Sequence, residues 1–186
     1  MNKRNGRLIV ISAPSGTGKS TIINNIKQLR PDLEFSISAT TRNPRNDEIH
    51  GESYYFVSRE RFQEMIDQGE LLEYACYVGE YYGTPKRPIY DHIEKGLDII
   101  LEIEVHGASQ VRALDFDIIT IFIVLPDKEE LERRLRGRGT DSETNLQARL
   151  EQARLELEEQ HHFSHVVVND NHIRAAEEIL SIIDRE

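Results

Sequence analysis

The stretch LIVISAPSGTGKST, at residues 8–21, decides the fold of this 186-residue chain. Its apolar beginning, Leu8 to Ile11, predicts a buried strand, and apolar residues recur at helical spacing from Ile22 to Leu29. A loop of small residues therefore joins a strand to a helix, which is the context of a phosphate-binding loop. The fold class expected from this start is α/β.

The loop has the composition that anion binding requires. Gly16 and Gly18 can adopt backbone angles closed to other residues, so that consecutive N–H groups converge on one anion. Lys19 can reach the terminal phosphates of a nucleoside triphosphate, and the Ser20 hydroxyl can ligate Mg²⁺. The alternative is a glycine-rich turn that only joins strand to helix. The predicted ATP-binding residues are Ala13 (where the motif usually has glycine), Pro14, Ser15, Gly16, Thr17, Gly18, Lys19, Ser20 and Thr21.

The composition limits the remaining functions. A net charge of −10 argues against binding to a nucleic-acid backbone, whereas arginines clustered near 42–45 and 133–138 favour small anionic ligands. The single cysteine, Cys76, lies in an apolar stretch, where we expect it to be buried, and it cannot form a disulfide within the chain. Since we find neither a signal-peptide pattern nor an apolar run of membrane length, we expect a cytoplasmic protein.

Strand-like and helical patterns alternate along most of the chain. Apolar runs at 98–104 and 118–125 have the character of buried parallel strands, so we expect a mostly parallel sheet flanked by helices. Two segments break the alternation, a strand-rich stretch at 36–85 and a charged helical stretch at 127–160. We interpret both as insertions that can close over the site.

Two local expectations concern the ends of these elements. Tyr81-Tyr82-Gly83 predicts a turn, and Thr84-Pro85 then predicts the cap and first residue of a helix. Glu102 and Glu104 are expected on the same side of one strand because side chains alternate. A solvated sheet end is the alternative interpretation of these two carboxylates.

A second informative stretch, SISATTRNPR, contains two arginines that can hold an anion. Arg42 and Arg45 are linked through Pro44 and predict a rigid fork for bidentate contact with a phosphate. Tyr54 and Tyr82 offer phenolic donors to the same anion. The stretch therefore predicts a second phosphate site besides the loop.

Together these stretches resemble guanylate kinases. The resemblance rests on the phosphate loop, on Ser-x-Ser-x-Thr-Thr-Arg-x-Pro-Arg at 36–45, on Gly-Glu-Tyr-Tyr-Gly-Thr at 79–84 and on Gly-Arg-Gly-Thr at 137–140. These motifs follow the family's order and cover essentially the whole chain. The resemblance implies a P-loop kinase with a core at 1–35, 86–126 and 161–186, a GMP-binding insert at 36–85, and a helical lid at 127–160.

The activity implied by the resemblance is the reversible transfer of the γ-phosphoryl group of ATP to GMP, with Mg²⁺ as cofactor. Its partners would be the small molecules ATP and GMP, with dGMP as a further candidate, and neither a nucleic acid nor a membrane. The residues that the resemblance places at GMP are Ser38, Arg42, Arg45, Tyr54, Glu73, Tyr82, Thr84, Glu102 and Glu104. Glu104 stands where the family usually has aspartate, and His106 where glutamine is common.

The chemistry of guanine agrees with this assignment. The base carries an acceptor at O6 and donors at N1 and N2, which a hydroxyl and a carboxylate complement. Adenine reverses the key contacts and would leave buried polar groups unpaired, so a site of this composition should reject it.

Arginines of the segment 127–160 are the candidate catalytic residues, together with Lys19. The resemblance implies that Arg134, Arg138 and Arg149 converge on the transferring phosphate, whereas we interpret Arg133 and Arg136 as parts of a solvated face. Asn169-Asp170-Asn171 lies near adenine by resemblance. A helix cap explains that stretch equally well, and it is not among the predicted site residues.

Two other functions remain as alternatives. A non-catalytic guanylate-kinase-like module would bind partner proteins, and we expect such a module to have a degraded phosphate loop. A kinase of another small phosphorylated acceptor would lack the base-reading residues. A GTPase would need an Asn-Lys-x-Asp signature, which the stretch at 169–172 does not match.

Overall fold

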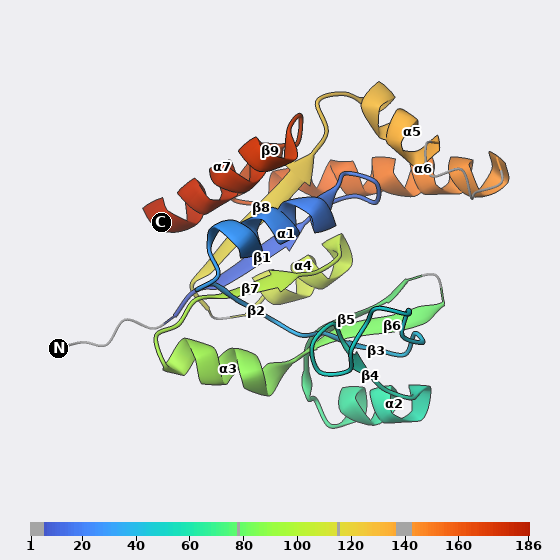
Figure 1. Cartoon of the computed structure of the whole chain (residues 1–186). Coiled ribbons are helices and arrows are strands. Elements are labelled where there is room, and N and C mark those ends of the chain that lie inside the picture. The colour runs from blue at the N-terminus through green and yellow to red at the C-terminus, as the bar shows by residue number, and fades with distance from the viewer. Residues whose placement is uncertain (1–5, 78, 115, 137–142) are drawn as a thin grey trace. The chain divides into compact units, whose positions relative to one another are not determined.

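The computed structural model describes residues 6–77, 79–114, 116–136 and 143–186. The chain divides into two compact units, whose elements are labelled in Figure 1. The first unit comprises Met1–Leu8 and Glu34–Ile118, and the second comprises Ile9–Leu33 and Ile119–Glu186. No helix in these described ranges is both long and apolar enough to cross a membrane.

The second unit contains the predicted phosphate loop. Its elements are β1 (Leu8–Ser12), α1 (Lys19–Leu29), β8 (Ile118–Val124), α5 (Lys128–Arg136), α6 (Glu143–Glu158), the 3₁₀ helix η1 (Glu159–His162), β9 (His165–Val168) and α7 (His172–Arg185). Strand β1 is buried along its whole length, and β8 lies between β1 and β9. Strands β8 and β9 are parallel, and α1 packs beside α7 (Figure 1).

Helices α5 and α6 pack through an apolar cluster. The buried members of the cluster are Leu125, Leu131, Leu135, Leu146 and Ala153, with Leu150 and Leu157 packed against them. Before α5, the carboxylate of Asp127 accepts the backbone N–H of Glu130 at 2.7 Å, as a helix-capping side chain does.

The first unit combines a parallel strand pair with a separate four-stranded sheet. Strands β2 (Glu34–Phe35) and β7 (Ile99–Glu102) are parallel. The strands of the other sheet, in spatial order, are β4 (Tyr55–Phe56), β3 (Ala39–Thr40), β6 (Glu80–Pro85) and β5 (Leu71–Tyr77). The helices are α2 (Arg59–Asp67), α3 (Lys86–Glu94) and α4 (Val105–Arg112).

Each helix of the first unit has a defined neighbour or cap. The Ser58 hydroxyl caps α2 by accepting the N–H of Arg61. Phe62 and Met65 of α2 pack with Ala39 and Leu71 in one buried cluster. Helix α3 contacts β7, and α4 contacts β5. The parallel strand pairs and the surrounding helices of the two units confirm the predicted α/β class.

The predicted turn at 81–83 is wrong. Residues 80–85 form strand β6, which pairs antiparallel with β5, so that Thr84 lies opposite Glu73 instead of capping a helix. Pro85 is the N-cap residue of α3. Tyrosine and threonine favour strands, and here that preference outweighs the turn preference of Gly83. Cys76 lies near the end of β5 and is exposed, not buried as expected.

The predicted strand at 98–104 is shorter than expected. Strand β7 ends at Glu102, and Glu104 is the N-cap residue of α4 with extended backbone angles. The expectation that Glu102 and Glu104 lie on the same side of one strand is therefore wrong. Helix α4 begins directly after Glu104, at Val105.

Candidate functional site

The loop between β1 and α1 has the backbone conformation of an anion-binding loop. Gly16 has φ +90° and Gly18 has φ +88°, both in the left-handed region that favours glycine. The Thr17 hydroxyl donates to the carbonyl oxygen of Pro14 at 2.8 Å, which closes the turn. Lys19 is the first residue of α1, and Ser20 and Thr21 lie exposed in its first turn.

Two side chains hold the loop through the same carbonyl oxygen. Arg134 Nη1 and Asn169 Nδ2 donate to the Thr17 carbonyl at 3.1 and 2.6 Å. Arg134 also donates through Nε to Glu130 at 2.7 Å. A Cβ atom at Gly18 would lie 2.9 Å from Asn169 Nδ2 and 3.2 Å from Arg134 Nη1. The backbone conformation at 18 favours glycine, and a side chain there would displace these two donors from the Thr17 carbonyl.

Helix α6 contributes a cation and a carboxylate that contact Ser15 of the loop. Arg149 Nη2 donates to the Ser15 hydroxyl at 3.0 Å. The carboxylate of Glu156, which is 8 % exposed, accepts the Ser15 N–H at 3.4 Å and the Gln152 amide at 2.9 Å. Two of the predicted catalytic arginines, Arg134 and Arg149, thus contact the loop directly. The third, Arg138, lies outside the described residues.

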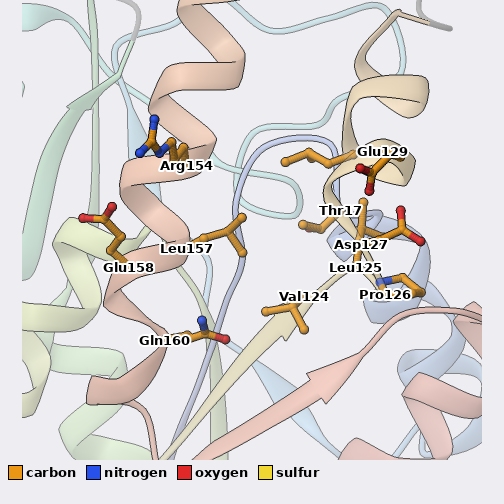
Figure 2. A pocket seen from close by; sticks show the side chains of 11 residues that line it. Thr17, Val124, Leu125, Pro126, Asp127, Glu129, Arg154, Leu157, Glu158 and Gln160 are labelled. Carbon is orange, nitrogen blue, oxygen red and sulfur yellow. The ribbon is translucent and has the colours of Figure 1, made fainter.

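A cavity of about 640 Å³ lies beside the loop. Figure 2 shows its side chains from α6 and η1, such as Leu157 and Gln160, facing those from the end of β8, such as Val124 and Leu125. The volume suits a small molecule. Among the described residues, Thr17 is the predicted ATP-binding residue that lines this cavity. The loop and the cations that contact it therefore define the candidate site.

In the first unit, Arg42 is clamped by a carboxylate. Its guanidinium donates to both oxygens of Glu48, at 3.0 and 2.8 Å, and Glu48 also accepts the backbone N–H of Arg45 at 2.7 Å. The hydrogen bond from Arg42 lowers the pKa of Glu48, and the N–H of Arg45 lowers it further, so Glu48 remains ionised at neutral pH. The hydrogen bond to Glu48 in turn raises the pKa of Arg42.

Aromatic rings surround the guanidinium of Arg42. Its central carbon lies 5.5 Å from the ring centroid of Tyr54 and 5.9 Å from that of Phe56. The Tyr54 and Tyr82 rings meet edge to face at 6.1 Å. Burial raises the pKa of the Tyr54 phenol, and the Glu102 carboxylate raises it further. Tyr54 therefore keeps its proton and can donate a hydrogen bond to an anion.

Glu73 and Thr84 form a buried polar pair across β5 and β6. The Thr84 hydroxyl donates to Glu73 Oε1 at 2.6 Å. Thr84 is 0 % exposed and Glu73 is 4 % exposed. A buried carboxylate is costly unless it is hydrogen-bonded. This pair can therefore receive a ligand that supplies N–H donors.

The remaining predicted residues lie at the edges of these groups. Ser38 directly precedes β3, and its carbonyl accepts the N–H of Tyr55 at 2.8 Å. Arg45 is exposed, Glu102 ends β7, and Glu104 precedes α4. The structure brings Arg42, Tyr54 and Tyr82 together, and separately Glu73 and Thr84, within the first unit.

The sequence interpretation missed two residues whose side chains hydrogen-bond the backbone of the loop, Asn169 and Glu156. Asn169 was excluded from the site, yet it is 2 % exposed and holds the Thr17 carbonyl. The helix-cap interpretation of the stretch 169–171 is confirmed at Asn171, whose side chain accepts the N–H groups of Ile173 and Arg174. Glu156 carried no signal beyond its place on an amphipathic helix. A polar residue directly after a buried strand was the signal for Asn169.

Comparisons with known proteins agree in pointing to one family. The guanylate kinase family model matches residues 5–186. A guanylate kinase of Synechococcus sp. (strain JA-3-3Ab) is 48% identical over 178 residues, covering 96% of this chain and 82% of that protein. One from Rubrobacter xylanophilus is 47% identical over 182 residues, covering 98% and 95%. The crystal structure of guanylate kinase from Anaplasma phagocytophilum has a TM-score of 0.80 at 32% identity, covering 98% of this chain and 86% of that one.

Proposed function

Because this chain belongs to the guanylate kinase family, we propose that it transfers the γ-phosphoryl group of ATP to GMP, giving ADP and GDP. The observation that carries the choice of acceptor is the buried pair of Glu73 and Thr84. The Glu73 carboxylate offers acceptors to the N1–H and N2–H groups of guanine, and the Thr84 hydroxyl fixes its orientation. The Ser38 hydroxyl can donate to O6.

The acceptor phosphate is assigned to the group around Arg42. Arg42 and Arg45 supply positive charge, and the phenols of Tyr54 and Tyr82 supply neutral donors. Glu48 accepts hydrogen bonds from both Nη1 and Nη2 of Arg42. The guanidinium is therefore oriented before GMP binds. The Glu102 carboxylate, at the end of β7, can orient a water molecule or an arginine at the same phosphate.

The ATP phosphates are assigned to the loop from Ala13 to Thr21. Its N–H groups and Lys19 bind the β- and γ-phosphates, and Arg134, Arg149 and Arg138 neutralise charge that develops during transfer. The exposed Ser20 hydroxyl is a hard oxygen donor in the first turn of α1, which fits Mg²⁺ held mainly by phosphate oxygens and water. Bound Mg²⁺ would neutralise phosphate charge.

We also propose which segments of the chain form the core, the GMP-binding insert and the lid, and in which compartment the protein acts. The core is assigned to 1–35, 86–126 and 161–186, the GMP-binding insert to 36–85, and the lid to 127–160. Closure of the insert and lid would exclude water, so that ATP is not hydrolysed without an acceptor. The exposed thiol of Cys76 suits a reducing compartment, and we place the reaction in the cytoplasm.

An ADP-release assay with several acceptors tests this function. With MgATP as donor, we expect ADP release with GMP and none above background with AMP, CMP or UMP, since neither adenine nor a pyrimidine presents guanine's adjacent N1–H and N2–H donors to the Glu73 carboxylate. Equal rates with AMP would contradict the base assignment. A folded protein that releases ADP with none of the four acceptors would support the non-catalytic binding module instead.

Replacing Glu48 with glutamine should weaken GMP binding. The neutral amide cannot pair with Arg42 as a bidentate anion, so we expect the KM for GMP to rise about 5- to 20-fold and kcat to change by less than about twofold. Steady-state kinetics with Asp47→Asn as the control measures this, because Asp47 is the exposed neighbour in sequence. An unchanged KM in Glu48→Gln would contradict the orienting role.

A further inference from the structure

We infer that Gly107 is a positioning residue for base recognition, because the space left by its missing side chain holds the carboxylate of Glu73. This inference rests on the proposed function, in which Glu73 accepts hydrogen bonds from guanine. It concerns helix α4, which contributes no base-reading side chain of its own to the predicted site.

The contact is closer than any side chain at position 107 would allow. Gly107 is buried in the first turn of α4. A Cβ atom there would lie 2.3 Å from Glu73 Oε2, 3.0 Å from Cδ and 3.5 Å from Cγ. The carboxylate therefore packs directly against the backbone of α4.

The backbone conformation alone does not require glycine at this position. Gly107 lies within the α-helix Val105–Arg112, and its φ is not among the positive values of the chain. Glycine destabilises a helix relative to alanine, so the glycine carries a local cost. The close approach of Glu73 supplies the reason for it.

Glu73 is confined from two sides by this arrangement. Thr84 Oγ1 donates to Oε1 at 2.6 Å, and Gly107 borders Oε2. The bond from Thr84 and the contact with Gly107 together confine the Glu73 carboxylate to one orientation, as a base with two adjacent N–H donors requires.

A methyl group at position 107 should therefore move the carboxylate and leave the fold intact. The clashing atoms are the end of a side chain and not backbone, so rotation of Glu73 relieves the contact. That rotation breaks the bond to Thr84 and misdirects the acceptors for N1–H and N2–H. The affected ligands are purine nucleotides that carry both donors.

The first experiment compares Gly107→Ala with the wild type. We expect the Kd for GMP by calorimetry and the KM for GMP to rise about 10- to 100-fold, with the KM for ATP within about twofold. The ratio of the Kd for IMP, which lacks the 2-amino group, to the Kd for GMP should decrease. Ser109→Ala is the control on the same helix, because the exposed Ser109 hydroxyl donates to the His106 carbonyl oxygen within α4 itself, at 2.7 Å. An unchanged Kd for GMP in Gly107→Ala would overturn the inference.

A double-mutant cycle separates positioning from a general loss of structure. In a Glu73→Ala background the clash is absent, so adding Gly107→Ala should leave the Kd for GMP unchanged within about twofold. A further rise equal to that in the wild-type background would overturn the inference. A wild-type protein that binds GMP without phosphorylating it would refute the proposed function, while the ratio of Kd values would still decide the role of Gly107.

Discussion

Replacing Lys19 with alanine is expected to lower kcat for GMP phosphorylation by about 10³-fold. Lys19 follows the left-handed Gly18 and begins α1, where its ammonium group can follow the charge that moves between the β- and γ-phosphates. Phosphoryl transfer depends on alignment and charge neutralisation more than on a strong base. Removal of this cation should therefore act on the transition state and not on the fold.

Lys27→Ala is the matched control for this substitution, since Lys27 lies in the last turn of the same helix. Steady-state ADP release and a thermal melt of each variant give the comparison. We expect Lys27→Ala to retain wild-type kcat within about twofold, and both variants to melt near the wild type. A kcat for Lys19→Ala within tenfold of the wild type would refute the catalytic role of the loop lysine.

Replacing Arg134 with alanine should lower kcat by about 10²- to 10³-fold. The guanidinium of Arg134 already lies against the loop, where Nη1 donates to the Thr17 carbonyl at 3.1 Å. Glu130 holds its other side at 2.7 Å. A cation fixed in this way needs little reorganisation to neutralise a transferring phosphate, so its loss should appear in kcat.

The neighbouring Arg133 provides a close control for Arg134. It pairs with the same Glu130 at 2.6 Å, but its side chain is 73% exposed. Surface ion pairs contribute little, so we expect Arg133→Ala to keep kcat within about twofold. Similar losses of kcat in the two variants would show that the effect comes from helix α5 as a whole, against a specific role of Arg134.

Much of the second unit could be predicted from sequence because its signals are local. The strand, the glycine loop and the helix at 8–29 follow one another without interruption, and each has its own pattern. The cap at Asp127 and the apolar stripe of α6 are likewise set by spacings of three and four residues. Such signals do not depend on what the rest of the chain does.

The errors of the sequence interpretation arise where distant pairing decides. Tyr81 to Thr84 form a strand because β5 supplies a partner, and nothing within the segment itself distinguishes that outcome from a turn. The same pairing leaves Cys76 exposed. Glu104 stops being part of a strand because α4 starts beside it.

The candidate site shows the same division. The sequence identifies arginines and glycines as site residues by their motif spacing. It does not identify the residues that orient other groups. Asn169 lies 152 residues from Thr17, whose carbonyl it holds, and Gly107 lies 34 residues from Glu73, whose carboxylate it borders. Contacts over such separations exist only in the folded chain, so a single sequence gives no sign of them.

The measurement that tests the central claim most directly follows the phosphorus atom itself. The protein is incubated with ATP labelled at the γ-phosphate, Mg²⁺ and GMP, and the products are separated by chromatography. We expect the label in GDP, with little free phosphate, and labelled GDP to form about 10³-fold more slowly with Lys19→Ala. Label that appears only in free phosphate would contradict the assignment of this chain as a phosphotransferase. Labelled ADP that forms from AMP as fast as labelled GDP forms from GMP would contradict its specificity for GMP.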